Sequence, residues 1–82
     1  MKLPRDLSGR ELVKLLSQYE YRLTRQTGSY LRLSSKIRGT EHHVTVPAHD
    51  SLKIGTLSAI LSDVALYLKI DRNTLEQTLF RK

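Results

Sequence analysis

The stretch Arg25-Gln26-Thr27-Gly28-Ser29-Tyr30-Leu31-Arg32-Leu33 decides the fold, because it predicts a β-hairpin with basic residues on both sides of the turn. Gly28 supplies the positive φ that a short hairpin loop needs, and Ser29 also favours turns. Side chains alternate between the two faces of a strand, so Tyr30 and Arg32 share one face and the two leucines share the other. The predicted hairpin is therefore polar on one side and apolar on the other.

The segments around this hairpin predict one helix before it, and a third strand and two helices after it. Ser8-Gly9-Arg10-Glu11 has the spacing of a capping box, and the apolar residues behind it recur at helical intervals. Pro47 ends the third strand because it has no N–H to donate to a ladder. The predicted elements are a helix over 9–19, strands over 21–26, 29–35 and 42–47, a helix from about 56 to 68, and a last helix over 71–80 capped by Asp71.

This order predicts an α+β fold of two layers, in which helices cover one face of a three-stranded antiparallel sheet. A chain of 82 residues forms one domain with one modest core. We expect the covered face to hold Leu23, Leu31, Leu33, Val44 and Val46. We expect the open face to hold Arg22, Thr24, Gln26, Tyr30, Arg32, Ser34, His43 and Thr45.

The strand register follows from the two loops. A three-residue turn over 27–29 and a symmetric closure of the loop over 36–41 predict four facing pairs. The pairs are Gln26 with Tyr30, Thr24 with Arg32, Ser34 with His43, and Tyr30 with Pro47.

The same register separates the histidines. At roughly 3.4 Å per residue, His43 lies about 13 Å along the sheet from Tyr30, which is too far for the two side chains to cooperate. His49 follows the third strand by two residues, and we expect it to be the nearer imidazole to Tyr30.

Charge indicates the class of partner. The net charge is +6, and between residues 22 and 38 there are five basic residues and no acidic one. Such a surface attracts backbone phosphates, whereas an ordinary solvated sheet face needs no one-sided charge. The sequence therefore favours a nucleic acid as the partner of the open face. The basic residues are Arg22, Arg25, Arg32, Lys36 and Arg38.

Composition excludes several kinds of site. The chain has no cysteine, so it forms no disulfide, thiolate zinc site or thiol nucleophile. Its first residues lack the apolar run of a signal peptide, and no stretch approaches the roughly 20 apolar residues that span a bilayer. We expect a cytoplasmic protein that does not contact membranes. His42 and His43 point to opposite faces, and no carboxylate lies at ligand spacing, so we expect no metal and no cofactor.

Three motifs in order carry a family resemblance. Arg25-Gln26-Thr27-Gly28-Ser29, then His43-Val44-Thr45-Val46-Pro47-Ala48-His49, then Lys53-Ile54-Gly55-Thr56-Leu57 resemble the HicA (YcfA-like) mRNA interferase toxins over about residues 7–68. The resemblance implies a fold similar to a double-stranded-RNA-binding domain and a metal-independent endoribonuclease that cleaves mRNA. It also implies a cognate HicB-like antitoxin protein that masks the toxin.

One residue departs from the family pattern. The resemblance implies a catalytic histidine directly after Gly28-Ser29, where this chain has Tyr30. An imidazole titrates near pH 6.5 and exchanges protons at neutral pH, whereas a phenol titrates near pH 10 and is a poor base. Tyr30 is consistent with a deliberate disabling substitution, with a natural member of blunted activity, or with a residue that stacks on RNA bases.

These observations predict an RNA-binding toxin whose cleavage is weakened or abolished. A catalytically silent RNA-binding protein and a module that only docks an antitoxin remain alternatives. We expect Tyr30 and His49 at the reaction centre. The expected RNA contacts are Arg22, Arg25, Gly28, Ser29, Arg32, Lys36 and Arg38.

Overall fold

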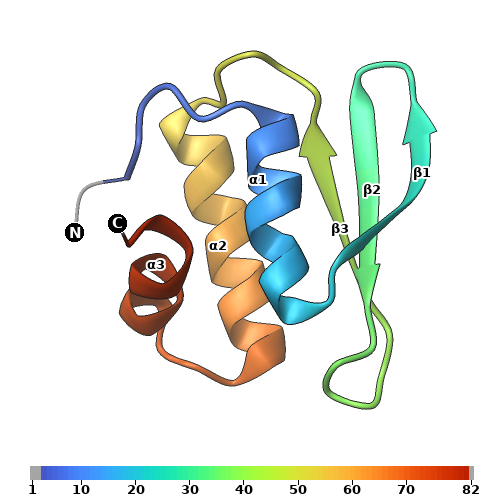
Figure 1. Ribbon diagram of the computed structural model, residues 1–82, viewed down its shortest axis with the longest axis vertical. Helices are drawn as coiled ribbons and strands as arrows, with labels where there is room; N and C mark the ends of the chain where they lie inside the picture. Colours follow the sequence, from blue (N-terminus) through green and yellow to red (C-terminus); the bar gives the residue numbers. More distant parts are fainter. Residues whose placement is uncertain (1–2, 82) are drawn as a thin grey trace.

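The computed structural model describes residues 3–81 and has the predicted α+β architecture of two layers (Figure 1). Three antiparallel strands form one sheet in the order β1-β2-β3, and the helices lie on one side of it. The elements are α1 (Gly9–Leu16), the 3-10 helix η1 (Ser17–Tyr19), β1 (Arg22–Thr27), β2 (Tyr30–Ser35), β3 (His42–Pro47), α2 (Ile54–Leu68) and α3 (Arg72–Phe80).

The start of α1 is fixed by the predicted capping box and by one glycine. The Glu11 backbone N–H donates to Ser8 Oγ at 3.0 Å, and the Ser8 N–H donates to the Glu11 carboxylate at 2.9 Å. The Ser8 backbone N–H, together with the Ser8 side chain, holds the pKa of the Glu11 carboxyl below its usual value. Gly9 donates its N–H to the His49 carbonyl at 2.9 Å, and a Cβ there would lie 2.0 Å from the Pro47 carbonyl oxygen. Glycine thus lets α1 approach the end of β3 closely.

The register between β2 and β3 is confirmed, and the one between β1 and β2 is not as predicted. Ser34 faces His43 and Tyr30 faces Pro47. Across the hairpin, however, Thr27 faces Tyr30, so the turn contains only two residues. Its first residue is Gly28, whose φ of 52° is the positive value predicted for it.

A β-bulge in β1 changes which side chains share the open face. The register shifts between Leu23 and Arg25, which puts Arg25 opposite Arg32. Thr24 stays on the open side, where its hydroxyl donates to the Arg32 carbonyl at 3.3 Å. The prediction for Gln26 is wrong, because this residue pairs with Leu31 and so belongs to the opposite face.

The helices cover β2 and β3 but leave β1 exposed. The inward residues of β2 and β3 are buried, and α1 and α2 both pack against β3. The prediction that Leu23 is covered is wrong, because its side chain is 45% exposed although its partner Leu33 is fully buried. Figure 1 shows β1 at the edge of the sheet farthest from the helices. Both faces of this edge strand are therefore accessible.

The last helix completes the core. Leu75 and Leu79 are buried as predicted, and Phe80 packs partly against the same cluster. Asp71 accepts from the Thr74 N–H at 3.3 Å and caps α3. Within residues 3–81, none of the helices has both the length and the hydropathy needed to cross a bilayer.

Candidate nucleic-acid interface

The open face carries a basic hollow at the hairpin end. Its lining consists of Arg25, Thr27, Tyr30, Arg32 and Thr45, without an acidic residue. The Tyr30 side chain is 56% exposed and so presents its ring and hydroxyl to water. An exposed aromatic ring that shares a hollow with two arginines has the composition of a surface that binds a phosphate backbone and stacks on bases.

A second hollow lies at the other end of the same face. It contains the cations Arg22 and Lys36, but also the carboxylates of Glu20 and Glu41. The rest of its lining is Thr24, Ser34 and Ser35. The two hollows therefore differ in charge: the one at Tyr30 is uniformly basic, and this one is mixed.

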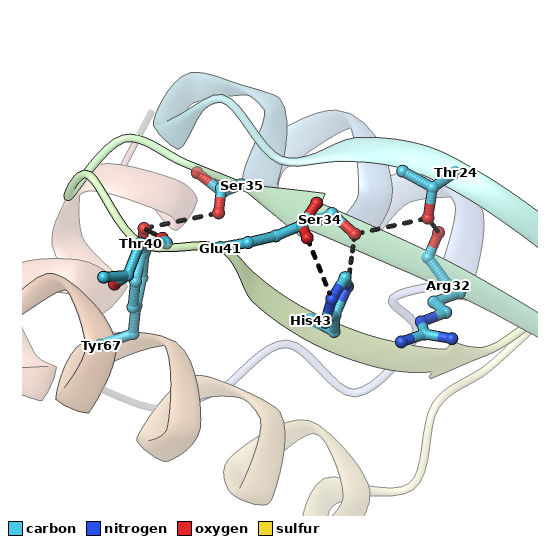
Figure 2. Close-up of polar contacts among 8 residues, drawn as sticks. All are labelled: Thr24, Arg32, Ser34, Ser35, Thr40, Glu41, His43 and Tyr67. Carbon is cyan, nitrogen blue, oxygen red and sulfur yellow. Dashed lines mark hydrogen bonds and ion pairs between the residues drawn. The ribbon is translucent and has the colours of Figure 1, made fainter.

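His43 lies at this second end and is tied into a row of hydroxyl groups (Figure 2). Its Nδ1 lies 2.6 Å from Ser34 Oγ, and Ser34 Oγ lies 3.4 Å from Thr24 Oγ1. On the other side of the ring, Nε2 lies 3.5 Å from a carboxylate oxygen of Glu41. The His43 side chain is 42% exposed, so the ring is held by its polar neighbours and is still accessible to solvent.

His42 has the opposite environment, on the helix side of the sheet. Its Nδ1 lies 2.6 Å from the Tyr21 hydroxyl, its Nε2 lies 3.3 Å from Asp63, and its ring stacks on Tyr67 with centroids 4.5 Å apart. Burial raises the pKa of the Tyr21 hydroxyl above its usual value, and the nearby Tyr67 and Asp63 groups raise it further. The sequence did not predict this cluster, which joins β3 to α2.

The loop over 36–41 is fixed by the same tyrosine of α2. The Tyr67 hydroxyl accepts from the Arg38 N–H at 3.0 Å and also contacts the carbonyl groups of Ser35 and Thr40. Lys36 lines the second hollow, whereas Arg38 lies in this loop, beyond the strands. Of the five predicted basic contacts, the structure thus brings four to the hollows of the open face and leaves Arg38 at its margin.

The remaining predicted site residues surround the hairpin turn. Gly28 and Ser29 are the exposed turn residues, and the Ser29 carbonyl accepts from the Ala48 N–H. His49 is exposed in the loop after β3. The proximity of its imidazole to the Tyr30 hydroxyl stays a prediction. In the part of the chain that the structure describes, no three histidine or carboxylate side chains gather in a way that could hold a metal ion.

A model of the family described as the HicA toxin of bacterial toxin–antitoxin matches residues 9–66, which is more than half of the chain. The chain belongs to the HicA toxin family. Membership makes it the toxin component of a toxin–antitoxin system, and a cognate antitoxin is its partner. The HicA match runs from α1 into α2 and includes the whole sheet, but it ends before α3. No curated protein and no solved structure shows a significant match to this HicA family member.

Proposed function

We propose that this HicA family member is an mRNA interferase that binds RNA on the open face of its sheet and cleaves it weakly because Tyr30 stands in the position of the catalytic histidine. The observation that supports RNA binding is the hollow of Arg25, Tyr30 and Arg32, which has no acidic residue. Two guanidinium groups on one small surface favour contacts to successive phosphates.

Tyr30 accounts for weak cleavage without loss of binding. A phenol is almost wholly protonated at neutral pH, so it is a poor acceptor for the proton of a ribose hydroxyl. A positioned acid or base is typically worth about 10²–10⁴-fold in rate. The exposed ring nevertheless retains the ability to stack on an unpaired base. A protein that binds RNA and does not cleave it would be the extreme form of this function.

A HicB-like antitoxin is the second partner in this proposal. An acidic surface on such a protein would match the same arginines, because complementary charge guides partner choice and speeds association. A module that docks the antitoxin and never engages RNA is the competing function, and it predicts no affinity for RNA.

The experiment compares this chain with Tyr30→His for cleavage of a mixed-sequence RNA and for growth arrest on expression. We expect both forms to bind RNA, and we expect the histidine form to cleave about 10²-fold faster or more. If neither form cleaves RNA, the proposal that this protein is an enzyme is refuted. Absence of RNA binding together with tight binding to the antitoxin would leave only the docking module.

The binding measurement has a charge-matched control. Arg32→Ala should reduce the slope of log affinity against log salt by about 1, because one phosphate contact is lost. Arg10→Ala removes the same charge from the exposed side of α1 and should leave that slope nearly unchanged if the open face is the binding surface.

A further inference from the structure

The hydrogen-bond row on the open face can hold a proton on Nδ1 of His43. Thr24 donates its single hydroxyl hydrogen to the Arg32 carbonyl, which accepts only. With Nδ1 of His43 protonated, Ser34 accepts from Nδ1–H and donates to Thr24. This arrangement makes three bonds. The reverse direction at Ser34 makes two of these bonds and turns an Nε2–H toward Glu41, whose carboxylate oxygen lies 3.5 Å away.

We propose that His43 is the general base of the residual RNA cleavage, with Nε2 as its reactive atom. This assignment rests on the proposed function and names the group that acts when Tyr30 does not. In this tautomer Nε2 carries the free lone pair, and the His43 side chain is 42% exposed. Arg32 is the diagonal neighbour of His43 on the same face, at a typical separation of about 7–8 Å, and is placed to hold the phosphate. Figure 2 shows both side chains on one side of the sheet.

The neighbouring groups have defined tasks in this assignment. Ser34 and Thr24 are positioning residues that hold the tautomer. Ser34 is not a nucleophile, because it is only 7% exposed and, in this arrangement, its hydrogen is directed to Thr24. Glu41 stabilises the imidazolium that forms when Nε2 takes a proton. The cations Arg22 and Lys36 offset the charge of Glu20 and Glu41 in the adjoining hollow.

The reaction is a transesterification in RNA. Nε2 of His43 takes the proton of a ribose 2′-hydroxyl, and the 2′-oxygen forms a bond to the adjacent phosphorus. The bond from phosphorus to the 5′-oxygen breaks, and that oxygen takes a proton from water. The hydroxide left behind removes the proton from the imidazolium. The products are a 2′,3′-cyclic phosphate and a 5′-hydroxyl end, and a substrate with 2′-deoxyribose at the cleaved position cannot react.

The test uses the full chain, a mixed-sequence oligoribonucleotide and the variants His43→Gln and His49→Gln. We expect His43→Gln to lower the cleavage rate about 10²–10⁴-fold while its RNA affinity changes less than about twofold. A 2′-deoxy oligonucleotide should bind and stay intact. Cleavage that survives in His43→Gln but is lost in His49→Gln would overturn the assignment in favour of His49. Binding without any cleavage by the unchanged chain would also overturn it, and absence of binding would overturn the proposed function itself.

The proton position has a readout that does not depend on activity. Long-range ¹H–¹⁵N spectra distinguish the two neutral tautomers of histidine. We expect the Nδ1–H form for His43 in the unchanged chain, and a shift toward a mixture in Thr24→Val, where Ser34 loses its acceptor. An Nε2–H form in the unchanged chain would contradict the assignment, because Nε2 would then have no lone pair to take a proton.

Discussion

His42 and His43 are adjacent in β3, yet their rings lie on opposite faces of the sheet and in opposite surroundings. The His42 ring stacks on Tyr67 and contacts the hydroxyl of the buried Tyr21, which has no other hydrogen-bond partner within residues 3–81. The Tyr21 hydroxyl therefore donates to Nδ1 of His42, whereas in the proposed arrangement Nδ1 of His43 donates to Ser34. The comparison shows that the element covering a face decides what its histidine does: α2 makes His42 structural, and the open face leaves His43 available for chemistry.

We expect the largest difference between His42 and His43 in how much their substitution lowers the stability of the fold. His42→Ala removes the hydrogen-bond partner of the Tyr21 hydroxyl and the stacking on Tyr67. Together these losses should lower the free energy of unfolding by about 2–4 kcal/mol. His43→Ala removes a ring from an exposed face and should cost less than about 1 kcal/mol. Urea denaturation of both variants measures the difference. Equal losses of stability in the two variants would show that His42 and His43 do not differ in their structural role.

We expect a smaller effect on stability at alkaline pH, where the Tyr21 hydroxyl can lose its proton. The folded state raises the pKa of this phenol above its ordinary value of about 10, so between pH 10 and the folded-state pKa the native chain keeps a proton that the unfolded chain loses. This contribution to stability is complete below about pH 10 and decreases as the pH rises, by at most about 1.4 kcal/mol per pH unit.

Tyr21→Phe supplies the control for this alkaline loss. The variant lacks the titrating hydroxyl, so its free energy of unfolding should change less between pH 9 and pH 11 than that of the unchanged chain. Urea denaturation at both pH values gives the two slopes. Parallel slopes would show that the Tyr21 hydroxyl is not held in its protonated form by the fold.

Most of the fold could be predicted from the sequence, and the exceptions lie in β1. A symmetric closure of the loop over 36–41 sufficed to align β2 with β3, including the Ser34–His43 pair. The predicted pairing of β1 with β2 is wrong because no single residue type signals a bulge at Thr24. The prediction that Leu23 is covered is wrong because alternation indicates which face a residue joins, but not whether a helix extends over that part of the face.

The site was predicted in part for the same reasons. Tyr30 and Arg32 lie on the open face as expected, but Arg25 joins them only because the bulge turns it to that side. The hydroxyl row also depends on the bulge, since it begins at Thr24. The cluster around His42 needs Tyr67 from α2, and periodicity within one segment carries no information about such distant contacts.

The most direct test of the account is a titration of the ¹⁵N-labelled chain with a short single-stranded RNA at low salt, followed by amide chemical shifts. The account predicts that the largest changes fall on β1, β2 and the open-face residue His43, and that α2 and α3 change little. Changes concentrated on α2 and α3, with the β1–β2 hairpin unaffected, would contradict it.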